Sequence, residues 1–154
     1  MRLIILSCFL LASVLSIAQN TDSDKRKKHY NLSKGTLAVE GYDVVSYHTG
    51  KPLKGVKSFS TIYNGITYYL SSQNNLNVFK KTPDKYEPVY GGWCAFAMGD
   101  SGEKVEVDPE TYKIVDGKLY LFYNAYLTNT LPKWNKDEKN LKTKAERNWL
   151  LIYK

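Results

Sequence analysis

The stretch FSTIYNGITYYL, residues 59–70, decides the class of fold because it predicts a β-hairpin. Residues 59–63 and 66–70 are rich in aromatic and β-branched side chains, which favour strands. Asn64 and Gly65 lie between them, and this dipeptide tolerates the positive φ that a two-residue hairpin turn requires at both central positions. We therefore expect two antiparallel strands that turn at this dipeptide.

A short helix is expected directly after the hairpin. Ser71 or Ser72 can cap its first turn, since a serine hydroxyl accepts a hydrogen bond from a free backbone N–H there. The helix should end near Lys81, because Thr82 precedes Pro83 and a residue before proline leaves the helical conformation.

Two further strand pairs are predicted on either side of these elements. Downstream, residues 111–115 and 118–123 flank the turn at 116–117. Upstream, residues 37–39 and 44–47 read as short strands separated by a four-residue turn. The hairpins therefore recur along the chain.

The C-terminal part, residues 124–154, is expected to be helical. Leu141, Ala145, Trp149 and Ile152 recur at helical spacing, so they share one apolar face. We expect this face to pack on the rest of the domain.

The composition fits one ordinary domain. The chain has 154 residues, of which 43% are hydrophobic and 24% charged, so it is too apolar for a disordered chain. Hairpins mixed with helices predict a single α+β domain over residues 34–154, with antiparallel hairpins packed with a short central helix and C-terminal helices. No apolar stretch is long enough for a transmembrane span.

The N-terminus has the layout of a secretory signal peptide. Residues 1–18 begin with a positive charge, continue with an almost wholly apolar stretch and end in small residues at Ala18. Cleavage there would place the protein in the periplasm or outside the cell. A retained anchor is the alternative, but the apolar stretch is short for one.

Residues 19–33 are polar and include the basic run Lys25–Lys28, so we expect a solvated tether. Contact of this run with anionic lipid is the alternative. Nucleic acid is not expected as a partner, because the chain has no recognisable nucleic-acid-binding motif.

Several segments together resemble the exported YHS-domain proteins of bacteria. Their order and spacing carry the resemblance, which covers most of residues 35–150, and they are GYDVVSY (41–47), YNG (63–65), PDKY (83–86), YGGWCA (90–95) and DGKLYL (116–121). The resemblance implies a small α+β module. It points to the branch with a Gly-Gly-aromatic-Cys segment, which is related to members with selenocysteine at the place of Cys94.

The resemblance also implies that a metal site found in related proteins is missing here. YHS domains of copper-transporting ATPases carry paired cysteines that suit a soft metal, and Ser71 and Asn75 stand at the corresponding positions here. Neither side chain supplies a thiolate, so that metal site is absent. The branch with the Gly-Gly-aromatic-Cys segment has no defined activity.

Cys94 is the first candidate for chemistry, because Cys8 would leave with the signal peptide. A thiolate is a strong nucleophile and a ligand for soft metals, and the glycines at 91–92 allow another group to approach closely. His48 and Met98 could complete a metal site with it, and this set of ligands would suit copper. The alternatives are a buried, inert cysteine, a loop histidine and a core methionine.

Aromatic residues around Cys94 could line a pocket for a small ligand. Trp93, Tyr90, Tyr42 and Asp43 are the candidates, although the rings could equally fill a core and Asp43 could hold a turn. No catalytic triad, phosphate loop or dinucleotide fingerprint is present, so the familiar hydrolases, kinases and dehydrogenases are excluded.

Two functions remain open, beside a purely structural role in which Cys94 is inert. The first is an exported, non-catalytic binding module that holds a metal ion or small ligand near Cys94. The second is a single-cysteine thiol-redox protein, which would need an external thiol to complete its cycle.

Overall fold

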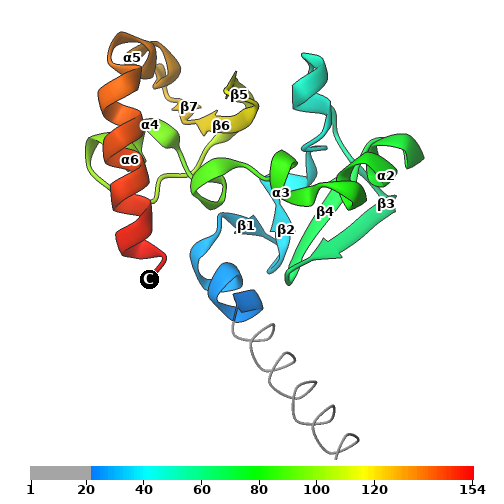
Figure 1. The fold of residues 1–154 in the computed structure, drawn as a ribbon. Helices are drawn as coiled ribbons and strands as arrows, with labels where there is room; N and C mark the ends of the chain where they lie inside the picture. The colour runs from blue at the N-terminus through cyan, green and yellow to red at the C-terminus, as the bar shows by residue number, and fades with distance from the viewer. Residues whose placement is uncertain (1–21) are drawn as a thin grey trace, which may run out of the picture.

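The largest sheet in the computed structural model, which describes residues 22–154, has four strands in the order β1-β2-β4-β3 (Figure 1). The pair β2–β4 is parallel and the other two pairs are antiparallel. The strands are β1 (Leu32–Ser33), β2 (Leu37–Ala38), β3 (Val56–Tyr63) and β4 (Ile66–Leu70).

The predicted hairpin at residues 59–70 is confirmed as β3–β4. Asn64 and Gly65 turn the chain with φ of 45° and 80°. On β4, Ile66, Tyr68 and Leu70 are buried and the residues between them are half-buried, which is the alternation of a strand with one face on the core.

The predicted helix after the hairpin is also confirmed, as α2 (Gln73–Lys81). Ser72 caps it, because its hydroxyl accepts a hydrogen bond from the backbone N–H of Asn75 at 3.1 Å. A one-turn helix, α3 (Pro83–Tyr86), follows at once, with its proline in the first turn.

The strand predicted over residues 44–47 is wrong. Two short 3-10 helices, η1 (Val39–Gly41) and η2 (Ser46–Thr49), form in this part of the chain. The side chain of Asp43 explains the difference, since it accepts a hydrogen bond from the backbone N–H of Val45 at 2.9 Å and so turns the chain into η2.

The second predicted hairpin is confirmed as β5 (Asp108–Val115) and β6 (Lys118–Phe122). The helix expected from residue 124 begins later than predicted. A small hairpin, β7 (Asn124–Ala125) and β8 (Thr128–Asn129), precedes it.

The C-terminal helices are α5 (Leu131–Lys136) and α6 (Glu138–Ile152), and α6 packs closely on α4 (Ala95–Asp100). The contact is close because Gly99 has no side chain, and a Cβ there would lie 2.5 Å from the backbone oxygen of Leu141. The predicted apolar face of α6 is confirmed, since four of its residues belong to or pack against one core cluster: Leu141, Ala145, Trp149 and Ile152.

Buried side chains form two clusters. The first lies around the four-stranded sheet and α2, and the second lies between β6, α4, α5 and α6. Figure 1 shows these two groups of elements at opposite sides of the molecule. The 3-10 helix η3 (Val89–Gly92) contacts β6, α4 and α6 of the second group.

The tether predicted over residues 19–33 differs from the structure where the structure describes it. Residues 22–29 are helical, and Arg26 is only 6% exposed because its guanidinium pairs with Glu87. These residues are therefore part of the domain. The predicted signal peptide lies outside the described residues.

A helix that crosses a membrane needs about 20 consecutive, mainly apolar residues. Among residues 22–154, no helix has the length and apolar character to cross a membrane.

Candidate functional site

Cys94, the first candidate from the sequence, is a fully buried side chain at the start of α4. Its sulfur accepts a hydrogen bond from the backbone N–H of Tyr123 at 3.3 Å and lies 3.5 Å from the hydroxyl oxygen of Thr130. That hydroxyl donates to the carbonyl of Tyr123 at 3.0 Å, so the thiol proton is directed to Thr130. The sulfur is thus engaged within the fold, as in a structural cysteine.

The two proposed metal partners of Cys94 lie in different surroundings. Met98 is fully buried in the second core cluster, whereas His48 belongs to η2 and packs edge-on against Tyr86 at 5.1 Å. Within residues 22–154, no group of three or more His, Cys, Asp or Glu side chains is arranged to hold a metal ion. The copper hypothesis gains no support from this arrangement.

Asp43 holds the fold together. One carboxylate oxygen accepts hydrogen bonds from the backbone N–H groups of Val45 and Ser46. The other accepts from the backbone N–H and the hydroxyl of Ser71, at 2.8 and 2.6 Å, and from the amide of Asn75 at 2.6 Å. With five hydrogen bonds and no exposed surface, this carboxylate has no capacity left for a ligand.

Tyr42 and Trp93 are also engaged in the fold. The hydroxyl of Tyr42 donates to Glu110 at 2.8 Å, and this bond, with partial burial, raises its pKa to about 12. The indole N–H of Trp93 donates to the backbone oxygen of His29 at 2.7 Å. Both residues therefore tie separate elements to one another.

Tyr90 is the exception among the residues predicted to line a ligand pocket, and among the predicted metal ligands the Nε2 of His48 is likewise buried without a partner among the described residues. It is 5% exposed, yet its hydroxyl has no hydrogen-bond partner among the residues that the structure describes. Burial raises the pKa of this hydroxyl above its usual value. The residue also adopts φ of 55° in η3, a left-handed conformation that is uncommon outside glycine and costs energy.

Tyr90 lines a cleft of about 510 Å³, a volume in the range of small-molecule sites. Tyr30 and Trp149 line the same cleft and stand directly against Gly91, where a Cβ would lie 2.8 and 2.9 Å from their rings. Tyr120 completes the aromatic lining, with its ring centroid 6.0 Å from that of Tyr90. The cleft is thus bounded by four aromatic rings from separate parts of the chain.

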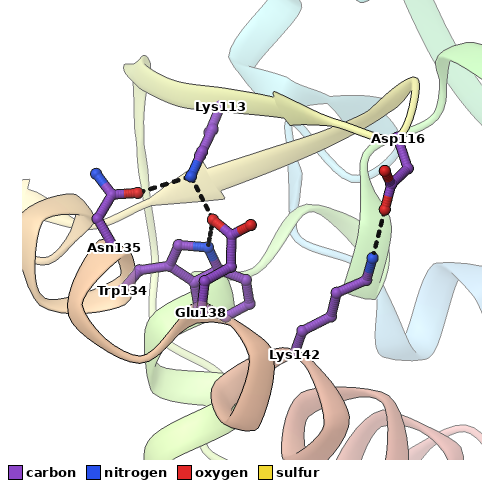
Figure 2. A network of polar contacts seen from close by, with 6 residues as sticks. All are labelled: Lys113, Asp116, Trp134, Asn135, Glu138 and Lys142. Carbon is purple, nitrogen blue, oxygen red and sulfur yellow. Dashed lines mark hydrogen bonds and ion pairs between the residues drawn. The ribbon is translucent and has the colours of Figure 1, made fainter.

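The wall formed by α6 is fixed in place by polar contacts with the β5–β6 hairpin (Figure 2). Lys142 on α6 donates to Asp116 at the hairpin turn, at 2.8 Å, and this bond lowers the pKa of the carboxyl group. Further along the hairpin, Lys113 pairs with Glu138, which also accepts the indole N–H of Trp134 at 3.0 Å. These contacts hold α6, and with it Trp149, beside the hairpin.

The lining also includes one member of a nearly buried ion pair. Glu87 lines the cleft and is held by the guanidinium of Arg26 and the hydroxyl of Tyr68. The helix at residues 22–29 therefore holds one residue of the cleft lining in place. Local sequence carries no signal for this arrangement, because Arg26 and Glu87 are 61 positions apart.

Comparisons of the chain with protein-family models, with curated proteins and with solved structures gave no match. The resemblance to YHS-domain proteins therefore stays a prediction.

Proposed function

We propose that this chain is an exported, non-catalytic binding module of the YHS type, and that it holds a small organic ligand in the cleft beside Tyr90. The observation that carries the proposal is the aromatic cleft lined by Tyr90, whose hydroxyl is buried without a partner among residues 22–154. An unsatisfied buried polar group costs about 1–3 kcal/mol. The hydroxyl itself is closed off from the cleft, so a ligand would have to displace a neighbouring side chain before it could hydrogen-bond to this group and recover part of that energy.

The walls of the cleft support binding because they are held in position before a ligand arrives. Gly91 fixes the approach of Tyr30 and Trp149, and the contact of Lys142 with Asp116 fixes α6. A rigid site loses less conformational entropy on binding than a flexible one.

Binding fits the lining residues better than nucleophilic catalysis. The residues that line the cleft include Tyr, Trp, Asp, Glu and Lys but no Cys, Ser or His. Export rests on the sequence of residues 1–18. The thiol-redox alternative and a metal on Cys94 are not favoured, because the sulfur is fully buried and hydrogen-bonded.

Nitrogen-15 NMR on the purified protein tests the proposal with a library of small organic compounds. Bound compounds should shift the amide signals of Gly91 and Gly92 and the indole signal of Trp149, because these groups lie at or next to the cleft. The amide of Tyr123, which donates to Cys94, should stay unchanged.

The variant Tyr90→Phe should weaken binding about 3- to 10-fold, the value of one hydrogen bond. Tyr47→Phe is the matched control, because its hydroxyl is equally buried but donates to the backbone oxygen of Pro109 at 2.8 Å. Shifts that centre on another part of the molecule, or equal affinities of the two variants, would contradict the proposal.

A further inference from the structure

The outward face of α6 near the C-terminus carries leucines between cations. Arg147, Leu150, Leu151 and Lys154 recur at spacings of three, one and three, so they lie on one side of the helix and its continuation. All four are exposed, and the two leucines are 66% and 59% exposed. This stripe lies on the solvent side of the helix, away from the buried residues Leu141 and Ala145.

A second group of cations lies at the same end of the molecule. The ring of Tyr153, directly after α6, packs edge-on against His29 at 6.0 Å, and the ammonium group of Lys25 lies 4.7 Å from its centroid. The ammonium group of Lys104 is 3.3 Å from the ring nitrogen Nδ1 of His29. Figure 1 shows the C-terminus close to this N-terminal part of the domain.

These cations repel one another. Partial burial and the charge of Lys28 lower the pKa of Lys104, and partial burial together with Lys104, Lys28 and Lys25 lowers the pKa of His29. Acidic groups adjoin them too: Asp22 lies 3.4 Å from the hydroxyl of Tyr153, Asp24 pairs with Lys27, and Glu103 and Glu146 directly precede Lys104 and Arg147.

We propose that this C-terminal surface, formed by Lys25, Lys28, Lys104, Arg147, Leu150, Leu151 and Lys154, docks the protein on an anionic phospholipid surface. Exposed leucines next to lysine and arginine are the combination that binds a lipid interface, because the apolar groups enter the acyl boundary while the cations meet the phosphates. Anionic lipid would also relieve the repulsion among the cations. A protein partner would need carboxylates to match them, and it is an outcome of the test below.

Two other exposed features of the chain are matched controls. Leu127 is fully exposed at the β7–β8 turn, and Lys133 and Lys136 are exposed on α5. Figure 1 shows α5 at the far end of α6 from the C-terminus. These residues have the same chemistry but lie outside the C-terminal surface.

Vesicle co-sedimentation of the exported protein, with its N-terminus determined by mass spectrometry, tests the proposal. Vesicles of phosphatidylcholine with about 30% phosphatidylglycerol should bind the protein, and vesicles of phosphatidylcholine alone should bind it at least about tenfold more weakly. Raising the salt concentration should weaken binding to the anionic vesicles, because ions screen exposed charges.

The double variant Lys25→Gln/Lys28→Gln should reduce the partition coefficient about 30-fold, from about 1 kcal/mol for each cation near an anionic surface. Leu150→Ser/Leu151→Ser should reduce it at least about tenfold, through lost burial of apolar surface. The controls Leu127→Ser and Lys133→Gln/Lys136→Gln should leave it unchanged, and all variants should keep the unfolding temperature of the wild type.

Absence of binding to anionic vesicles, equal binding to neutral vesicles, or an equal loss in the controls would overturn the proposal. Capture of an acidic protein in place of vesicles, with loss of that capture in the two C-terminal-surface variants, would also overturn it, since the surface would then be a protein interface.

Discussion

The side chains of Asp43 and Tyr90, at two buried turns of this protein, use their polar groups in opposite ways. The turn at Asp43 leads into η2, and both oxygens of its carboxylate and the hydroxyl of Tyr47 have partners, whereas the buried Nε2 of His48 in η2 has none among the described residues. The turn at Tyr90 forms η3, where the hydroxyl is as inaccessible as that of Tyr47 but has no partner among the described residues. The first turn contributes to stability, and the second keeps a polar group unpaired beside the cleft.

The difference follows from what surrounds each turn. Asp43 is enclosed by donors from Ser71, which directly follows β4, and from Asn75 on α2. Tyr90 lies at the cleft, where the side chains of Tyr30 and Trp149 come from distant parts of the chain. An unpaired polar group is tolerated at such a place when function requires it.

The largest expected effect on stability is at the turn formed by Asp43, whose carboxylate is fully hydrogen-bonded. Asp43→Ala should lower the free energy of unfolding by about 4 kcal/mol, because it removes the acceptor of five hydrogen bonds, two from buried backbone N–H groups and three from the half-buried donors of Ser71 and Asn75. Urea unfolding at neutral pH measures this value. A loss below about 1 kcal/mol would show that water or other groups replace the carboxylate, and the comparison between the turns would then fail.

The next effect concerns the support of the cleft. Arg26→Ala should lower the free energy of unfolding by about 3 kcal/mol, because it leaves Glu87 charged and nearly buried. Lys27→Ala is the control, since Lys27 is exposed and its pair with Asp24 should contribute less than about 0.5 kcal/mol. If both variants lost the same free energy of unfolding, residues 22–29 would instead be a solvated tether, as the sequence predicts.

The third prediction concerns Cys94, four positions after Tyr90. Cys94→Ala should lower the free energy of unfolding by about 2 kcal/mol, through a small cavity and lost hydrogen bonds of Tyr123 and Thr130. In the wild type, the thiol should react with an aromatic disulfide reagent only after denaturant is added. Rapid stoichiometric reaction of the folded protein would restore Cys94 as a functional candidate.

The smallest effect is the pH dependence from His48. Burial and the charge of Lys85 lower its pKa, so the unfolded state takes up a proton first as the pH falls through about 6.5. Stability should therefore decrease below that pH, and His48→Gln should remove this part of the decrease. A difference between wild type and variant that stays constant from about pH 7.5 to 5.5 would contradict the cause assigned here.

Elements set by neighbouring residues could be predicted from the sequence. Asn64–Gly65 and the cap at Ser72 act within a few residues, and both are found where expected. The strand expected at residues 44–47 was wrong. The prediction gave more weight to the β-branched pair Val44–Val45 than to Asp43, a residue that is typical of turns. Only the partners at Ser71 and Asn75, far along the chain, show how strongly that turn is held.

The candidate site could be predicted only in part. Tyr90 is among the predicted ligand residues because it adjoins the Gly-Gly pair, but Cys94 stands out in the sequence through its reactivity alone. Whether a sulfur is buried depends on packing, and Tyr123 and Thr130 reach it from 29 and 36 positions away. Tyr30 and Trp149 join the cleft through the tertiary fold, which no local pattern encodes.

The most direct test of the central claim is the free energy of unfolding of Tyr90→Phe and Tyr47→Phe, measured by urea denaturation without added ligand. Tyr47→Phe should lose about 1 kcal/mol, because it breaks a buried hydrogen bond to Pro109. Tyr90→Phe should be as stable as the wild type or more stable, because it removes a buried hydroxyl that has no partner in the part of the chain that the structure describes. Equal losses in the two variants would contradict the account, since the hydroxyl of Tyr90 would then already be paired inside the protein.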